Sequence, residues 1–482
     1  MTDTTAVPSS AAPAMRVALI VAGAFFMETL DGTVIVTALP QIGHSFAVAA
    51  TDLTLGVTAY LLTLAAFIPA SGWAADRFGS RTVFATAICL FTLASVLCGL
   101  SGGFWSFIAA RVLQGFAAAL MAPVGRLVVL RTAKKSELVR TMATLTWPAL
   151  IAPVLGPAVG GFITTYASWR WIFFLNLPLG ILGASLALAY VPNHRESRPT
   201  PFDWPGFALT ATSLASIVYG LDLLSRREAN PSLAFGLMAA GLVIGVMAVR
   251  HALGAKHPLL DLKVLKVGSF VISTLSSGAL MRIAVSATPF LLPLMFQLIF
   301  GMNALQAGLL VLVYMAGNLM MKTVTTPILQ GFGFRNVLVV NGLFNSAAIL
   351  ACGLLTPGAP RGLMWAVLFA AGAFRSMNFT ANNTLAFADL PPERRSGATA
   401  LAGAAQQVCF SLGVATAAVL LNLSLTVRNA PALALIDFRY AFAAMALASL
   451  AATVGYWSLD PAVGREVSGH RPKSVAPPSE SL

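Results

Sequence analysis

Long runs of apolar residues, separated by short breaks of polar, charged, Gly or Pro residues, dominate the chain. A helix that spans the hydrocarbon core of a bilayer needs roughly 20 mostly apolar residues. The chain holds fourteen such runs: 17–40, 52–73, 82–102, 105–130, 141–164, 171–191, 205–224, 232–251, 269–298, 305–328, 336–355, 362–386, 397–425 and 438–458. This pattern predicts an all-α membrane protein with 14 transmembrane helices, of which the seventh and eighth are the least distinct.

The overall composition agrees with lipid as the solvent of this chain. Hydrophobic residues make up 57% of the 482 residues and charged residues only 10%, whereas a soluble domain carries about 25% charged residues. The net charge of +13 does not indicate nucleic acid as a partner, because no basic run is long or interleaved with aromatic residues. Basic residues in cytoplasmic loops account for this charge better.

Basic residues are distributed unequally between alternate loops. An even number of crossings places both termini on one side of the membrane. With that side in the cytoplasm, the cytoplasmic segments hold 19 Lys and Arg residues and the external segments hold 6, as the positive-inside rule requires. The run after Arg16 is too long for a signal peptide and lacks a clear cleavage site. We therefore expect a multi-pass protein of the inner membrane with both termini in the cytoplasm.

The sequence holds no pattern typical of a metal centre or a nucleotide site. The four cysteines, Cys89, Cys98, Cys352 and Cys409, lie inside apolar runs without metal-ligand spacing. The loops are short and no P-loop sequence occurs, so neither an ATP-driven pump nor an enzyme is expected. We expect a monomeric secondary transporter without cofactor or metal, whose partners are a small-molecule substrate, protons and the lipid bilayer.

A short repeat divides the chain into two halves. The tetrapeptide Phe78-Gly79-Ser80-Arg81 follows the second run, and Phe332-Gly333-Phe334-Arg335 follows the tenth. If the seventh and eighth runs are an insert, these segments occupy equivalent places in two six-helix halves, as in many secondary transporters. The expected organisation is a disordered cytoplasmic tail (1–16), an N-terminal six-helix bundle (17–191), a linker with helices seven and eight (192–268), a C-terminal six-helix bundle (269–458) and a second cytoplasmic tail (459–482).

Five short segments occur in order along the first six runs. They are Leu30-Asp31-Gly32-Thr33-Val34 with Ala38-Leu39-Pro40, Gly72-Trp73-Ala74-Ala75-Asp76-Arg77-Phe78-Gly79-Ser80-Arg81, Arg111-Val112-Leu113-Gln114-Gly115, Gly156-Pro157-Ala158-Val159-Gly160-Gly161 and Trp169-Arg170-Trp171-Ile172-Phe173-Phe174-Leu175-Asn176-Leu177-Pro178. Together they resemble the signatures of the fourteen-helix drug:proton antiporter family of the major facilitator superfamily, over residues 20–458. Ala74 and Ser80 depart from the family pattern, which has Leu and a basic residue there. The resemblance implies two six-helix bundles with two additional helices, and proton-driven efflux of drugs.

Two acidic residues, Glu28 and Asp31, lie within the first run. Because they are three residues apart on a helix, they share a face about one turn apart. A carboxyl group in a water-filled cleft can load and release a proton, so we predict that both take part in proton coupling. Asp31 could instead be a structural acid that bonds a neighbouring helix. Glu28 could contact substrate, line the cavity without a special role, or serve packing.

Several basic and amide side chains also fall within apolar runs. For Arg111 the resemblance implies a role in proton transfer, and the alternative is an ion pair with Glu28 or Asp31. Arg282 and Arg375 could hold a carboxylate or phosphate of a substrate, or pair between helices. We predict that the substrate cavity draws on Glu28, Gln114, Arg282, Arg375 and Asn378. Arg126 and Lys322 lie nearer helix ends and are expected to reach the membrane surface.

Two further segments are predicted to serve the moving parts. In the fifth run, Pro153, Gly156, Pro157, Gly160 and Gly161 combine kinks with small residues, so another helix can approach closely. The alternative is that these residues serve tight packing alone. In the loop after the second run, the candidate residues are Gly72, Asp76, Arg77, Gly79 and Arg81. Asp76 is expected to pair with a basic residue, or to cap a helix, as a latch when the cytoplasmic side is closed.

Two functions remain open from the sequence. The first is proton-driven efflux of drugs or of small hydrophobic or organic metabolites. The second is a dedicated carrier, and in one version an importer, of a single nutrient or metabolite such as a vitamin, an organic acid or a siderophore. The segment in the fifth run favours the first, and the excess of cations over acids within the apolar runs favours the second.

Overall fold

The computed structural model describes residues 11–132, 138–196, 201–224, 230–256, 258–260, 262–390 and 395–465. These residues form α-helices and one short 3-10 helix, and none of them forms a β-strand. The elements are α1 (Ala11–Phe46), α2 (Thr54–Phe78), α3 (Ser80–Leu100), α4 (Phe104–Thr132), α5 (Leu138–Tyr166), α6 (Trp171–Phe174), α7 (Asn176–Tyr190), α8 (Trp204–Leu224), α9 (Pro231–Gly254), η1 (Leu262–Lys266), α10 (Gly268–Thr274), α11 (Ser277–Leu298), α12 (Ala304–Leu354), α13 (Arg361–Ala388), α14 (Arg395–Val427) and α15 (Leu435–Tyr456).

Within the described residues, eleven helical segments are long and apolar enough to cross a membrane. The other three predicted runs fall on α5, whose counted apolar part is shorter, on the second half of the 51-residue α12, and on α13. α12 divides at Gly333, where the backbone is not helical. The structure is therefore consistent with the fourteen predicted crossings, and the chain is an all-α, multi-pass membrane protein.

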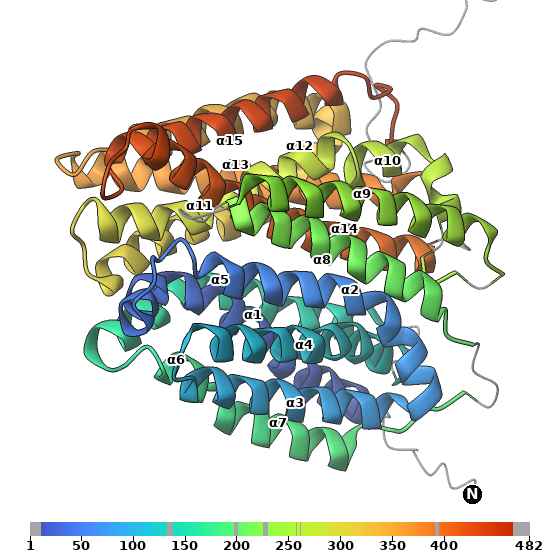
Figure 1. Cartoon of the computed structure of the whole chain (residues 1–482). Coiled ribbons are helices and arrows are strands. Elements are labelled where there is room, and N and C mark those ends of the chain that lie inside the picture. The colour runs from blue at the N-terminus through green and yellow to red at the C-terminus, as the bar shows by residue number, and fades with distance from the viewer. Residues whose placement is uncertain are drawn as a thin grey trace, which may run out of the picture.

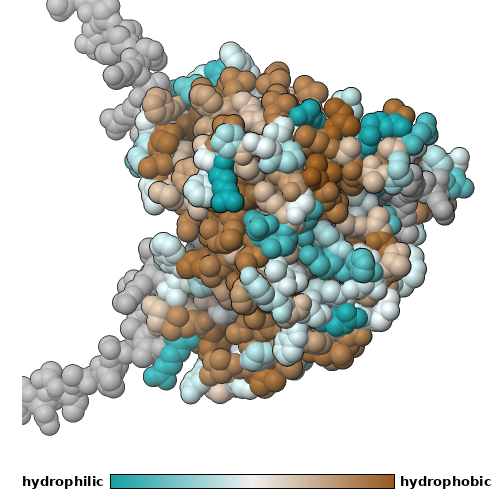
Figure 2. Space-filling model, turned by 90° about the vertical axis from the view of Figure 1, so that its left-hand side faces the viewer, coloured by the Kyte–Doolittle hydropathy of each residue, from teal (hydrophilic) through white to brown (hydrophobic). Residues whose placement is uncertain are grey.

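Large apolar side chains cover much of the outside of the molecule. On α9, for example, Leu242, Val246 and Leu253 are 62%, 59% and 68% exposed. An apolar surface of this kind is unfavourable in water and suits the hydrocarbon chains of a bilayer. Figure 2 looks onto one end of the helices, the left-hand end of Figure 1, where hydrophilic side chains lie among hydrophobic ones.

The helices gather into two bundles with a hairpin beside them (Figure 1). The N-terminal bundle comprises α1 to α7, and the C-terminal bundle comprises α10 to α15. The bundles meet where α5 contacts α12 and where α2 contacts α14, and the α8–α9 hairpin contacts α2 and α14. The junction of α2 and α3 lies at the right-hand end of Figure 1, which we call the tail end, and the opposite end is the far end. Of the two predicted tails, residues 1–10 and 466–482 lie outside the described residues.

Two glycines mark equivalent junctions in the two bundles. Gly79 joins α2 to α3 with a φ of 93°, and Gly333 divides α12 with a φ of 72°. Positive φ angles are readily adopted by glycine and are costly for other residues. The repeated tetrapeptides of the sequence therefore occupy matching sharp turns between consecutive membrane-spanning helices.

The glycines of α5 lie where other helices approach most closely. A Cβ atom added at Gly156 or Gly160 would collide with the Thr33 and Thr37 side chains of α1. One added at Gly161 would collide with the backbone of Ala304 on α12. α5 is therefore packed tightly against α1 within its own bundle and against α12 in the other bundle. This closeness is the one expected from the small residues of the fifth run.

Candidate functional site

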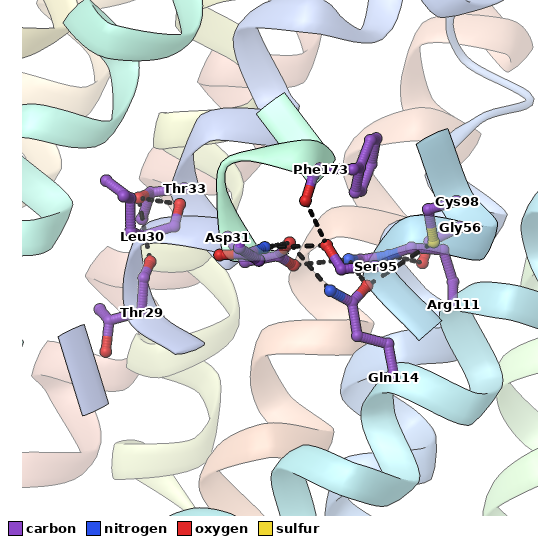
Figure 3. Close-up of polar contacts among 11 residues, drawn as sticks. Thr29, Leu30, Asp31, Thr33, Gly56, Ser95, Cys98, Arg111, Gln114 and Phe173 are labelled. Carbon is purple, nitrogen blue, oxygen red and sulfur yellow. Dashed lines mark hydrogen bonds and ion pairs between the residues drawn. The ribbon is translucent and has the colours of Figure 1, made fainter. Parts of the chain in front are cut away.

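A buried ion pair joins α1 to α4 in the N-terminal bundle (Figure 3). Arg111 Nη1 lies 2.7 Å from Asp31 Oδ2, and the two side chains are 0% and 1% exposed. Arg111 also donates from Nη1 to Gln114 Oε1 at 2.5 Å and from Nε to the Gly56 carbonyl at 3.3 Å. Its guanidinium carbon lies 4.3 Å from the centre of the Tyr60 ring. Of the two partners that the sequence left open for Arg111, the structure therefore pairs it with Asp31.

The second carboxylate oxygen of Asp31 is also fully engaged. Oδ1 accepts hydrogen bonds from Gln114 Nε2 and Asn176 Nδ2, both at 2.9 Å. Asn176 also donates to Ser95 Oγ at 2.9 Å, and Ser95 donates to the Phe173 carbonyl at the same distance. With the Gly56 carbonyl included, the network connects α1, α2, α3, α4, α6 and α7.

This network makes the ion pair stable but costly to disturb. Burying a charge is unfavourable unless it is paired and hydrogen-bonded, and here three side chains donate to one carboxylate. Removing one partner of such a pair leaves the other charge uncompensated, at a cost of about 3–5 kcal/mol. Asp31 is thus held as an acceptor, and a change in its protonation would change its contacts with two other helices.

A central cavity of about 1160 Å³ lies between the two bundles. Its lining comes from helices of both bundles, and from Leu259 in the segment after α9. The charged and amide residues that line it are Glu28, Arg126, Asn318, Lys322, Arg375, Gln406 and Gln407, and the phenylalanines are Phe25, Phe290, Phe379 and Phe410. Of the predicted cavity residues, Glu28 and Arg375 line this space, whereas Gln114, Arg282 and Asn378 do not.

Glu28 and Asp31 have different surroundings although they are one helical turn apart. Glu28 lines the cavity, and its Oε2 atom is buried without a hydrogen-bond partner. Asp31 does not line the cavity and contacts α4 and α7 instead. Glu28 therefore lies in the cavity wall, and Asp31 lies in the packed core behind that wall.

Contacts between the bundles close the cavity towards the far end. Gln297 of α11 donates to the Thr37 carbonyl at 3.0 Å, and Gln41 donates to Gln297 at 3.2 Å. Leu305 N donates to Thr165 Oγ1 at 3.1 Å. The lining extends the other way to Leu130, two residues from the end of α4 at the tail end. The cavity is therefore blocked on one side of the molecule and reaches towards the other.

Three cations of the C-terminal bundle, Arg282, Lys322 and Arg375, are buried or half-buried without an acid of the described chain beside them. Arg282 donates to the Ser273 carbonyl at 2.6 Å and to Asn383 Oδ1 at 2.9 Å, so it bridges the break between α10 and α11. Lys322 donates to Thr380 Oγ1 at 2.8 Å, and Arg375 Nε has no hydrogen-bond partner. No carboxylate of a described residue lies within ion-pair distance of these three side chains. Arg126 and Lys322 were both expected to reach the membrane surface, and both line the cavity instead.

The loop segment after α2 makes the contact that its acid suggested. Asp76 accepts from Arg131 at 2.8 Å, and Arg131 lies 3.7 Å from Glu196. Arg81 N donates to Asn193 Oδ1 at 3.2 Å, and a Cβ atom at Gly79 would collide with the same asparagine. Gly72 lines the cavity and Arg77 is exposed. This segment therefore fastens the tail ends of α2, α3 and α4 to the chain that follows α7.

The prolines and glycines of α5 serve two surfaces. Pro153 and Pro157 line the cavity, while Gly156 and Gly160 face α1 and Gly161 faces α12. The Pro157 carbonyl is also the group that a Cβ atom at Gly308 of α12 would meet. α5 therefore links the cavity wall, the helix that carries Asp31, and the other bundle.

Two residues of the network, Ser95 and Asn176, were not among the predicted site residues. Asn176 lies inside the Trp169-to-Pro178 segment that the sequence singled out, as an amide within an apolar run. Its position was a usable signal, because polar residues at membrane depth need a partner. Ser95 gave no such signal, since a serine can satisfy itself on its own helix.

Comparison with known proteins agrees on one superfamily. The family model of the Major Facilitator Superfamily matches residues 21–414 and, in a second match, 274–481. Over 412 residues, 84% of this chain and 85% of the relative, the sequence is 37% identical to MdtD of Escherichia coli O6:H1, a protein named for multidrug resistance. MdtD of Escherichia coli K12 is 36% identical over the same shares.

Solved structures with the same fold share little sequence with this chain. A crystal structure of a D-xylose-proton symporter superposes with a TM-score of 0.66 at 16% identity, over 92% of this chain and 97% of that chain. An auto-inhibited peptide transporter of the POT family gives a TM-score of 0.65 at 15% identity, over 95% and 98%. At this identity the likeness concerns the arrangement of the helices alone.

Proposed function

Since this chain belongs to the Major Facilitator Superfamily and is a membrane transporter, we propose that it exports drug-like or other small hydrophobic organic compounds in exchange for protons. The name of the MdtD relatives supports the cargo. The buried Asp31–Arg111 pair supports the coupling and is the single observation on which the proposal rests. Transport of this kind needs no enzymatic step and no cofactor.

We further propose that the tail end faces the cytoplasm of a bacterial inner membrane. The excess of basic residues in the predicted cytoplasmic segments supports this orientation. The central cavity would then accept cargo from the cytoplasm, while the contacts around Gln297 close it towards the outside. In this proposal a single copy suffices, with residues 17–191 and 269–458 as moving halves and residues 192–268 as the connecting unit.

A proton on Asp31 would act on the helices that control the two bundles. Protonation removes one charge of the pair, so Arg111 loses its ionic partner and the contacts of α1 with α4 change. α1 packs against Gly156 and Gly160 of α5, and α5 contacts α12 of the other bundle. A shift of α1 thus has a direct mechanical route to the interface that must open for release. Glu28 in the cavity wall is the proposed exchange point for protons on the cytoplasmic side.

Transport against a gradient tests this proposal. Purified protein in proteoliposomes is given a lipophilic fluorescent dye and an imposed pH gradient, and uphill accumulation is measured together with downhill counterflow. Asp31→Asn should abolish uphill accumulation and retain counterflow, because the titrating site is lost while the cavity stays intact. Exposed Asp389 supplies the matched control as Asp389→Asn. Uphill accumulation at the wild-type rate in Asp31→Asn would make this residue structural and remove the basis of the proposal.

A further inference from the structure

Resting on the proposed transport, we propose that the cargo is an amphipathic organic anion. The anionic group, a carboxylate or a similar oxyanion, is held by Lys322 of α12 and Arg375 of α13. The apolar part of the molecule lies against the aromatic side chains beside them. The site is the wall of the central cavity formed by the C-terminal bundle.

The charges around the cavity favour an anion over a cation. Of the described residues that line it, three are cations, Arg126, Lys322 and Arg375, and Glu28 is the one acid. A lipophilic cation in this space would meet three like charges and one opposite charge. An anion would meet the reverse, so Coulomb attraction favours the anion.

Lys322 and Arg375 each have hydrogen-bond donors that are not used within the described part of the protein. An ammonium group carries three donors and a guanidinium group five. Lys322 uses one donor on Thr380 at 2.8 Å, and Arg375 Nε has no acceptor. No carboxylate of the described chain offsets either charge. Arg375 also lies 6.0 Å from the centre of the Tyr314 ring. A half-buried charge without an ionic partner is unfavourable, and a bound oxyanion would supply that partner.

Aromatic surface lies next to these donors. The rings of Phe379 and Phe410 are stacked, with centroids 6.1 Å apart and an interplanar angle of 27°. Phe379 adjoins Thr380, the partner of Lys322, so the ring and the cation belong to one stretch of α13 and its neighbour α12. An aromatic or aliphatic body with one anionic group fits this combination.

The opposite wall limits where the anion can sit. Glu28 lies on α1, in the N-terminal bundle, together with Arg126 of α4, whose guanidinium carbon is 5.5 Å from the centre of the Phe25 ring. The one acid of the described lining therefore belongs to the N-terminal wall, and the charged residues of the C-terminal wall are cations alone. Cargo and proton would therefore be handled by different bundles.

Equilibrium binding to the purified full-length protein in lipid nanodiscs tests the cargo class without any gradient. The probes share one skeleton and differ in charge: 2-naphthoate, neutral 2-naphthamide and cationic 2-naphthylmethylammonium. Wild-type protein should bind the anion at least about tenfold more tightly than either of the others, as expected for one charge-assisted hydrogen bond in a buried site. Equal or tighter binding of the cation would overturn the proposal without any variant.

Substitutions then locate the site. Lys322→Gln and Arg375→Gln should each weaken naphthoate binding by about tenfold and leave naphthamide binding within about twofold. Arg375→Lys should restore part of the loss, and exposed Arg250 of α9 serves as the control in Arg250→Gln. An equal loss for naphthoate and naphthamide, or an unchanged naphthoate affinity, would contradict the assignment.

The outcome separates the cargo from the proton coupling. Asp31→Asn should keep the naphthoate affinity, because Asp31 does not line the cavity. If the wild type binds the anion but does not transport it uphill, the proposed proton-driven export is wrong and the proposed anion site is retained. Proton-driven transport of the naphthyl cation with no anion binding would overturn the site and leave the exporter standing.

Discussion

The two bundles treat their buried cations in opposite ways. In the N-terminal bundle Arg111 is completely buried, paired with Asp31 and surrounded by amide and carbonyl partners. In the C-terminal bundle Lys322 and Arg375 line the cavity, and no carboxylate of a described residue forms an ion pair with either. A compensated charge is suited to a switch, because protonation of its partner breaks a contact. An uncompensated charge in a cavity is suited to a ligand. We infer that the N-terminal bundle couples transport to protons and that the C-terminal bundle binds the cargo.

The largest expected effect concerns the pair itself. Arg111→Leu leaves the Asp31 carboxylate buried without its ion partner, and we expect a loss of about 3–5 kcal/mol of unfolding free energy. The double variant Arg111→Leu with Asp31→Asn should recover part of that loss, since no buried charge remains. The unfolding free energies of both variants are measured in detergent, with tryptophan fluorescence as the signal. A single variant as stable as wild type would mean that Asp31 is already neutral in the folded protein.

Tight packing of α5 gives the next effect. In Gly160→Leu the new side chain meets Thr37 and the Val34 carbonyl of α1, and overpacking of this kind costs about 1–3 kcal/mol. Transport should fall with it, because α1 and α5 must stay in contact. Gly236→Leu on α9 is the matched control, since nothing lies within 4 Å of its added Cβ atom. Equal behaviour of the two variants would show that the glycine contacts are incidental.

A smaller effect is expected at the hairpin beside the bundles. Asp203, just before α8, accepts from Gly206 N, His251 Nε2 and Leu259 N at 3.0, 2.7 and 3.1 Å. Burial opposes ionisation of this carboxyl, but these hydrogen bonds outweigh it and hold its pKa below the ordinary 3.8. Asp203→Ala should cost about 1 kcal/mol, as for other helix caps.

The pH dependence of Asp203 follows from the direction of that shift. Because the folded pKa lies below the unfolded one, the contribution is fully present above the unfolded pKa and is lost as the pH falls through the folded pKa. Unfolding measured in this acidic range should therefore be less pH-dependent in Asp203→Asn than in the wild type. Identical pH profiles would show that the carboxylate is not held by these bonds in solution.

The smallest effect on stability, and the sharpest contrast with Arg111, is expected at the cavity cation. Arg375→Gln removes a charge that has no carboxylate partner in the described chain, so unfolding free energy should change by less than about 1 kcal/mol. The measurement is the same detergent unfolding as for Arg111→Leu. A loss as large as that of Arg111→Leu would mean that Arg375 is an internal structural charge and would weaken the division between the bundles.

The sequence predicted the helices well because lipid imposes a simple rule on length and polarity. Even the least distinct runs, 205–224 and 232–251, correspond to α8 and α9. The breaks at Leu175 and at Leu275 to Ser276 were not predicted, although Pro178 lies in the first turn of α7 and Gly278 in the first turn of α11. Apolar periodicity is insensitive to a break that keeps both parts in the membrane.

The sequence predicted several residues of the site but not which of them contact one another. Helix spacing put Glu28 and Asp31 together, but which of them meets Arg111 depends on how α1 and α4 are rotated against each other. Lys322 was assigned to the membrane surface by its position near a helix end, whereas packing of the two bundles turns it into the cavity. Arg282 bridges a helix break that the sequence did not reveal. Contacts between distant helices decided each of these cases.

Proton movement itself tests the central claim most directly. Proteoliposomes with a trapped pH-sensitive dye receive 2-naphthoate on one side, and the pH change inside is recorded for wild type, Asp31→Asn and Arg375→Gln. The account predicts a cargo-dependent proton flux in wild type and none in Asp31→Asn at any cargo concentration. It predicts a flux in Arg375→Gln that returns when the cargo concentration is raised about tenfold. A full proton flux in Asp31→Asn would contradict the account.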